Sequence, residues 1–147
     1  MTDGPVVFAY DGSDLAKLAI DEAARQLGPR RDALVLTVWQ PFDLGFVPET
    51  ELQINAAEIE QVKKAAAQTA AHGAELANTA GFKAASAEVE LAPTWKGIVH
   101  VAEEHDASLI VLGSHGRTGL ASVLIGSVAE AVAAHSRRSV LIVHRPA

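Results

Sequence analysis

The sequence predicts an α/β fold in which a five-stranded parallel sheet carries helices on both faces. Short, continuous apolar runs, which are typical of strands buried on both faces, alternate along the chain with segments of helical periodicity. This alternation of strand and helix implies right-handed crossovers between parallel strands. The length of 147 residues suits one hydrophobic core, and neither a repeat nor a linker divides the chain. We therefore expect residues 1–147 to form a single domain.

The first two strands and the helix between them are marked by their apolar pattern and by turn residues. Val6 to Tyr10 is a continuous apolar run that ends in an Asp-Gly-Ser turn. From Asp14 to Leu27 the apolar residues recur at helical spacing, and Gly28-Pro29 ends the predicted helix. A second apolar run, Ala33 to Trp39, is followed by a predicted loop at 42–48, where glycine and proline interrupt the pattern.

The rest of the chain continues the alternation of helix and strand. A long segment rich in Ala, Glu, Gln and Lys has high helix propensity, and Gly81 follows it as a stop signal. Gly73 within this segment predicts a bend or a close packing contact. The next strand alternates apolar and polar residues, so we expect one of its sides to be more exposed. The predicted helices are 49–80, 95–102 and 127–135, and the predicted strands are 85–91, 109–112 and 140–143.

Composition excludes several classes of function. Twelve Lys and Arg against 18 Asp and Glu give a net charge of −6, without the basic stripe that follows a nucleic-acid backbone. The lack of cysteine excludes disulfides, Cys-ligated metal centres and a Cys nucleophile. The histidines lack metal-ligand spacing, so we expect no structural metal site. The sequence shows neither a signal peptide nor an apolar run of membrane-spanning length, and we expect a cytoplasmic protein with no nucleic-acid or membrane partner.

The segment that follows the strand at 109–112 has the composition of a phosphate-binding loop. It reads Gly-Ser-His-Gly-Arg-Thr-Gly from Gly113 to Gly119, and Gly126-Ser127 opens the next helix. Glycines after a buried strand permit positive φ angles and let backbone amides approach an anion. The helix start and the Ser127 hydroxyl can add further donors. The alternative is a tight turn without a ligand, since the segment is neither a Walker A loop nor a Gly-x-Gly-x-x-Gly turn.

The pattern Gly113-x2-Gly116-x9-Gly126-Ser127 resembles the Gly-x2-Gly-x9-Gly-Ser/Thr signature of the ATP-binding branch of the universal stress protein family. Other similar stretches lie along the whole chain, at residues 6–13, 106–117, 124–130 and 140–144. The resemblance implies a Rossmann-like fold, in agreement with the order of elements derived above. It also implies that the ligand is ATP, with which Mg²⁺ can arrive while using one carboxylate at most.

Carried onto this sequence, the family pattern implies a division of the nucleotide site. Asp11 and the backbone around Val38 would contact the adenosine part, with Ala9 and Leu112 beside the base. Ribose and phosphates would be held by Gly113, Gly116, Gly126 and Ser127. Because these positions follow the carboxyl ends of several parallel strands, we expect them at one edge of the sheet.

Two of the candidate residues have a competing interpretation. Asp11 before Gly-Ser can form an Asx turn or cap the following helix, and both roles can coexist with ligand binding. Arg117 can reach a terminal phosphate through two hydrogen bonds, or it can be a solvated or partner-facing group.

Three functional hypotheses remain open, and we favour the first. In the first, the chain is a nucleotide-binding stress or signalling module without fast chemistry. In the second, it is a slow ATPase in which Asp11, a metal ion or His115 orients water. In the third, it is a dimeric interaction protein that binds AMP, cyclic AMP or no nucleotide.

The apolar strand Val140 to Val143 resembles the edge through which family members form homodimers, and an unpaired apolar edge is a liability. The alternative is that this strand is central and buried.

Overall fold

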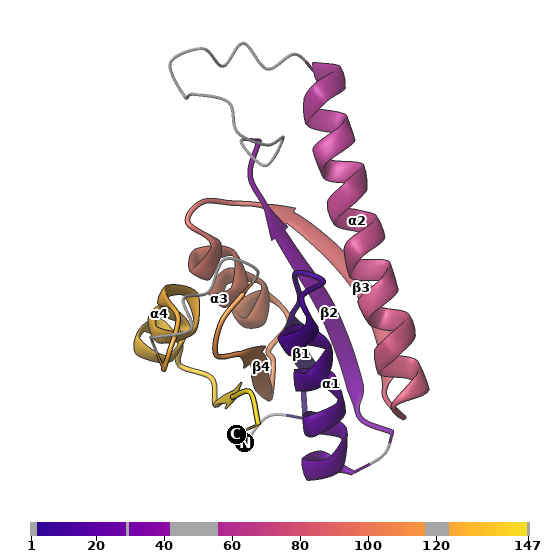
Figure 1. The fold of residues 1–147 in the computed structure, drawn as a ribbon, viewed down its shortest axis with the longest axis vertical. Coiled ribbons are helices and arrows are strands. Elements are labelled where there is room, and N and C mark those ends of the chain that lie inside the picture. The colour runs from indigo at the N-terminus through magenta and orange to yellow at the C-terminus, as the bar shows by residue number, and fades with distance from the viewer. Residues whose placement is uncertain (1–2, 29, 42–55, 117–123, 147) are drawn as a thin grey trace.

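The computed structural model describes residues 3–28, 30–41, 56–116 and 124–146. The elements in chain order are β1 (Val6–Ala9), α1 (Asp14–Leu27), β2 (Asp32–Trp39), α2 (Ala56–Thr79), β3 (Lys83–Glu90), α3 (Thr94–Glu104), β4 (Leu109–Gly113), α4 (Ser127–His135) and β5 (Val140–Val143). Helices α1 and α2 cover one face of the sheet, and α3 and α4 cover the other (Figure 1). The predicted α/β architecture is confirmed.

The five strands are parallel and lie in the order β3-β2-β1-β4-β5. The chain first winds outward from β1 through β2 to β3, and then crosses to β4 and β5 on the other side of β1. The strand order therefore reverses between β1 and β4, which are hydrogen-bonded neighbours. This reversal leaves β5 at an edge of the sheet, so the alternative of a central final strand is wrong.

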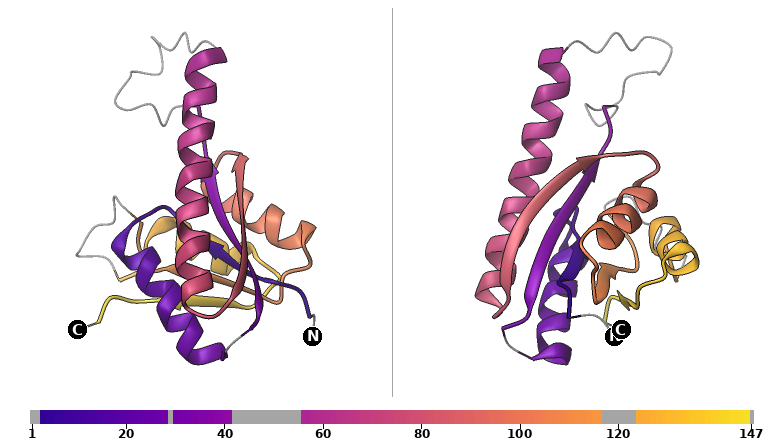
Figure 2. Two further views of the ribbon diagram at one scale, coloured as in Figure 1. Left: turned by 90° about the vertical axis from the view of Figure 1, so that its right-hand side faces the viewer. Right: turned by 180° about the vertical axis from the view of Figure 1, so that it is seen from behind.

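Successive residues of β1 enter different layers of the core. Phe8 packs with the residues under α1 and α2, and its ring meets that of Phe82 edge to face at 5.2 Å. Val7 belongs to the cluster under α3 and α4, which also contains Ile98 and Val132. Both layers exclude water from the strand, which explains why a continuous apolar run rather than an alternating one marks it in the sequence. The view from behind shows the sheet between its two helical layers (Figure 2).

Most predicted boundaries agree with the structure, and the differences have local causes. Strand β3 begins at Lys83, two residues before the predicted start, because the Lys83 amide donates to Arg31 O at 2.9 Å and extends the pairing with β2. Helix α2 ends before Gly81, whose φ of 111° suits a residue without Cβ. The predicted loop at 42–48 and the predicted start of this helix at Glu49 lie outside the described residues.

An ion-pair cluster holds the start of β5 against the end of α3. Arg138 donates from Nη2 to Glu103 at 2.8 Å and from Nη1 to Asp106 at 2.6 Å. The hydrogen bond from Arg138 lowers the pKa of the Glu103 carboxyl below its usual value. Because the carboxylates are exposed, the cluster serves more to position the chain than to stabilise the fold.

No helix in the four described ranges combines the length and the apolarity that a membrane crossing requires.

Gly73 marks a close packing contact rather than a free position on α2. A Cβ atom at Gly73 would lie 2.7 Å from Tyr10 Cδ2 and 2.7 Å from Val35 Cγ1, and both of these residues are buried. In an open helix position Gly→Ala stabilises by about 1 kcal/mol, whereas overpacking a core costs about 1–3 kcal/mol. The overpacking cost exceeds the propensity gain by about 0–2 kcal/mol, so we expect Gly73→Ala to lower the free energy of unfolding by about 1 kcal/mol in urea denaturation.

The control for this prediction is Ala71→Gly, at an exposed position two residues earlier on the same helix. This control should lower the free energy of unfolding by about 1 kcal/mol through helix propensity alone. It therefore measures the propensity gain that overpacking offsets in Gly73→Ala. A Gly73→Ala variant that is more stable than the parent chain would contradict the packing explanation.

Candidate functional site

The carboxyl ends of β1, β2 and β4 form the edge at which the candidate residues gather. Asp11 follows β1, Val38 lies near the end of β2, and Gly113 ends β4. Strand β1 pairs with both of the others, so these residues lie at one end of three adjacent strands. In open α/β sheets the ligand crevice is found outside the carboxyl ends of strands where their order reverses. Here that point is between Asp11 and Gly113.

Asp11 connects the start of α1 with the glycine segment. Its Oδ1 accepts a hydrogen bond from the Ser13 amide at 2.9 Å, while Ser13 Oγ accepts from the Ala16 amide and caps α1. The Asx turn considered from the sequence is therefore present. The other carboxylate oxygen lies beside Gly116, because a Cβ atom added there would be 2.7 Å from Asp11 Oδ2. One carboxylate thus orders the α1 turn and borders the glycine segment.

The glycines of the signature are required for space and not for their backbone angles. None of Gly113, Gly116 and Gly126 adopts a positive φ, so the expectation that these glycines use that freedom is wrong. A Cβ atom at Gly113 would lie 2.8 Å from Leu15 Cγ, and one at Gly126 would lie 2.9 Å from Ser114 O. A larger residue at Gly113 or Gly126 would therefore force neighbouring atoms to shift, whereas at Gly116 the atom in the way is the end of the Asp11 side chain.

Backbone hydrogen bonds join the two halves of the signature. The Gly126 amide donates to Ser114 O at 2.6 Å, which brings the start of α4 against the end of β4. The Ser114 amide in turn donates to Val143 O at 2.8 Å, at the end of β5. Residues 114, 126 and 143 are thereby held together although they are distant in the sequence.

The start of α4 presents backbone donors without a side-chain cap. Gly126 occupies the N-cap position, and no side chain makes a cap hydrogen bond there. The first bond of the helical turn runs from the Glu130 amide to Gly126 O at 3.0 Å. The amides of residues 127–129 precede that bond and have no carbonyl partner within the helix. Together with the helix dipole, such amides attract an anion.

The residues assigned to the adenosine side lie on the sheet face that α3 and α4 cover. Ala9 and Val38 are half-buried, whereas Leu112 is only 3% exposed and supports the site from beneath. Gly97 of α3 lies close to Val38, since a Cβ atom at Gly97 would be 2.8 Å from Val38 Cγ1. The Thr37 hydroxyl donates to Tyr10 O at 2.9 Å and holds the ends of β1 and β2 together.

Some candidate residues fall outside this arrangement, and others were missed. Arg117 lies outside the described residues. Ser114, to which the sequence reasoning assigned no role, is 2% exposed, and its Oγ lies 3.1 Å from His115 Nδ1. Its position directly after a buried strand was the one signal in the sequence that could have pointed to Ser114. Within the described ranges, no group of three or more His, Asp or Glu side chains is arranged to hold a metal ion.

The phenol of Tyr10, the residue before Asp11, has a shifted pKa. Burial raises the pKa of Tyr10 above its usual value, and the negative charge of Asp11 adds to the increase. The phenol therefore stays neutral at physiological pH. It packs on Gly73 of α2, on the side of the sheet away from α4, and contributes shape rather than charge.

Comparison with known proteins identifies the family. The family model described as the universal stress protein family matches residues 4–144. Universal stress protein MJ0531 of Methanocaldococcus jannaschii is 31% identical over 144 residues, which cover 96% of this chain and 82% of the relative.

Two solved structures extend the comparison. The structure of the M. jannaschii protein MJ0577 has a TM-score of 0.78 at 25% identity, covering 100% of this chain and 99% of that one. A universal stress protein in complex with cAMP has a TM-score of 0.62 at 28% identity, covering 96% of each chain. The chain therefore belongs to the universal stress protein family.

Proposed function

We propose that the chain is an adenine-nucleotide-binding universal stress protein, with ATP as its ligand, that serves as a stress-response or signalling module without fast catalysis. The observation that carries this proposal is the contact between the two halves of the signature. The hydrogen bond from the Gly126 amide to Ser114 O places three glycines and the uncapped start of α4 around the reversal point of the sheet. Backbone amides in such an arrangement suit phosphate groups.

The same arrangement supports the proposed division of the site. Asp11, Ala9 and the backbone at Val38 would contact adenosine above Leu112, whereas Gly113, Gly116, Gly126 and Ser127 would hold ribose and phosphates, with Arg117 as a further phosphate ligand. A family member that is 28% identical has been solved with cAMP, which supports an adenine nucleotide in this chain. The carboxylate of Asp11 borders Gly116 and suits a single contact to a Mg²⁺ ion that arrives with the triphosphate.

The contacts favour holding a nucleotide over hydrolysing it. Hydrolysis needs a group that orients and deprotonates water. Asp11 Oδ1 is engaged by the Ser13 amide. A slow metal-dependent ATPase remains the alternative, and phosphate release that requires Mg²⁺ and is lost in Asp11→Ala would support it.

We also propose that β5 pairs two copies of the chain. Strand β5 is an edge strand, and Val140, Leu141 and Ile142 are only half-buried. The amides of Ile110 and Ser114 bond to Ser139 O and Val143 O. Since alternate residues of a strand point their backbone groups to opposite sides, Val140 and Ile142 direct theirs away from β4.

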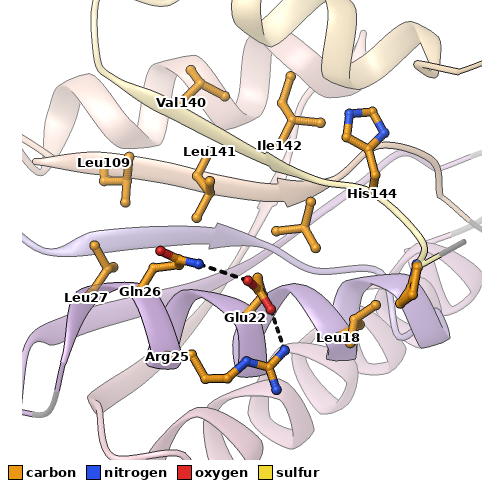
Figure 3. Close-up of a pocket in the computed structure, with 12 residues that line it drawn as sticks. Leu18, Glu22, Arg25, Gln26, Leu27, Leu109, Val140, Leu141, Ile142 and His144 are labelled. Carbon is orange, nitrogen blue, oxygen red and sulfur yellow. Dashed lines mark hydrogen bonds and ion pairs between the residues drawn. The ribbon is translucent and has the colours of Figure 1, made fainter.

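A groove of about 600 Å³ adjoins this edge, between α1 and β5 (Figure 3). Leu18 and Leu27 of α1 and Leu141 of β5 form part of its apolar lining, and Glu22 bonds to Arg25 and Gln26 along α1. The groove is separate from the glycine site. It supplies apolar area beside the unpaired edge, which favours a second copy of this chain over an isolated strand contact.

Isothermal titration calorimetry with ATP, ADP, AMP and cyclic AMP tests the nucleotide proposal. We expect a 1:1 exothermic transition with ATP, and weaker binding as phosphates are removed because fewer oxygens meet the amides of α4. Flat traces for all four compounds would overturn the assignment.

Gly126→Ala tests the contact between the halves of the signature. The new Cβ atom would meet Ser114 O at 2.9 Å, so the start of α4 must shift, and we expect ATP affinity to fall at least about tenfold. Ala134→Gly is the matched control, because it weakens α4 at an exposed position away from the site. Equal ATP affinities of Gly126→Ala and the parent chain would contradict the model of a site that depends on this approach.

Ile142→Pro tests the edge pairing. Proline removes an outward-facing amide while leaving the hydrogen bonds to β4 intact, which edge strands tolerate. We expect the parent chain and the Ile142→Val control to be dimers in light scattering, and Ile142→Pro to be a folded monomer. A monomeric parent chain at micromolar concentration would refute the dimer.

A further inference from the structure

The backbone pairing between β1 and β2 ends one hydrogen bond earlier than their register allows. The Tyr10 amide donates to Leu36 O at 2.8 Å, which continues the ladder beyond Ala9. In a parallel ladder the next bond would run from the Val38 amide to Tyr10 O. That bond is missing among the described residues. The carbonyl oxygen accepts instead from the Thr37 hydroxyl at 2.9 Å, and β1 ends at Ala9.

This substitution of donors leaves the Val38 amide without a partner in the part of the chain that the structure describes. The direction of the amide follows from its place in β2. Trp39 O accepts from the Leu91 amide on the β3 side, whereas Leu36 O accepts from Tyr10. Even positions of β2 therefore direct their backbone groups toward β1. At Val38 these groups face the place where β1 has ended, beside the reversal of strand order.

Resting on the nucleotide-binding function proposed above, we propose that Thr37 is a positioning residue for the base of the nucleotide. By occupying Tyr10 O, its hydroxyl keeps the Val38 amide free to donate to a ring nitrogen of the base. Thr37 is only 8% exposed, so it acts through Val38 and does not touch the ligand itself. Val38 and Ala9 are half-buried, and each keeps exposed surface at which a ligand can approach.

A hydroxyl is needed at position 37 because the Tyr10 carbonyl is buried with its residue, which is 3% exposed. A buried carbonyl that lacks a donor loses the hydrogen bonds that water supplies in the unfolded chain. Without the hydroxyl, the donor that the ladder offers is the Val38 amide, and the two strands would pair for one bond more. Threonine therefore satisfies the carbonyl from a side chain and leaves a backbone donor for the ligand. Its branched Cβ also suits the strand, so valine preserves its shape and removes only the donor.

The free backbone groups of Val38 suit an adenine base. The amide donates, and the carbonyl of the same residue faces the same side of the strand and accepts. Adenine presents an acceptor nitrogen, N7, beside the donor amine at N6, whereas guanine presents two acceptors at that edge. Adenine can therefore satisfy both groups of Val38, and guanine would place an oxygen against the Val38 carbonyl.

Hydrogen exchange of the backbone amides in the free chain tests the substitution of donors without any ligand. We expect the Val38 amide to exchange at least about tenfold faster than the Leu36 amide, which lies within the ladder. In Thr37→Val the Val38 amide should bond to Tyr10 O, and its exchange should slow by about tenfold or more. Thr37→Ser keeps the hydroxyl and should match the parent chain. Equal protection of Val38 in the parent chain and in Thr37→Val would refute the proposal.

Calorimetry tests the contact with the base. We expect Thr37→Val to weaken ATP and adenosine by the same factor, about fivefold to tenfold, because the lost hydrogen bond is to the base. Thr37→Ser should stay within about twofold of the parent chain. Thr69→Val is the matched control, since the Thr69 hydroxyl on α2 also donates to a backbone carbonyl, Ala65 O, at 3.0 Å. Parent-like affinities of Thr37→Val for both compounds, or a loss confined to ATP, would contradict a base contact.

The same exchange measurement on the parent chain with ATP separates this inference from the proposed function. The Val38 amide should become protected when ATP binds. If the parent chain binds neither ATP nor adenosine, the proposed function fails and the role of Thr37 fails with it. If ATP binds and the Val38 amide exchanges as fast as before, the role of Thr37 alone is refuted.

Discussion

The contact between Gly126 and Ser114 is the constraint on which the rest of the site depends. The Gly126 amide reaches Ser114 O at 2.6 Å, and a Cβ atom at Gly126 would approach that same oxygen at 2.9 Å. A residue with a side chain would therefore push α4 away from the end of β4. With the contact in place, the helix start, the glycine segment and Asp11 converge where the strand order reverses. The Ser114 amide continues the linkage to Val143 O and connects the site with the edge strand.

Burial on both faces made the fold predictable from the sequence. Four-residue strands such as β1 and β5 are short, but their runs of apolar residues have no helical period and stand between turn signals. Turn and cap residues were equally reliable signals where they act within a few residues, as Ser13 does at the N-terminus of α1. Boundaries that depend on distant partners were less accurate: β3 starts at Lys83 because Arg31 O accepts its amide. The order of the strands is a tertiary property that no local pattern encodes.

The sequence predicted where the candidate residues gather, but not why glycine is needed at the signature positions. The signature glycines were found from their spacing, yet they avoid contacts with Leu15, Asp11 and Ser114 instead of adopting positive φ. Those neighbours come from other elements, so the sequence alone does not reveal them. The same holds for Ser114, which is buried and whose carbonyl meets the start of α4. Asp11 was assigned two competing roles, and one carboxylate has an oxygen for each.

Under the function proposed above, the nucleotide would act as a signal without being consumed. The start of α4 has no side-chain cap, and one of the two Asp11 carboxylate oxygens accepts the Ser13 amide. Under the same proposal, such a site would stabilise the charge of bound phosphates. Ser114 connects the candidate site with the edge of the sheet, because its carbonyl accepts from the start of α4 while its amide donates to the end of β5. Phosphates that draw the start of α4 toward themselves would act on both bonds, and β5 is the strand whose outer edge is open to a second chain.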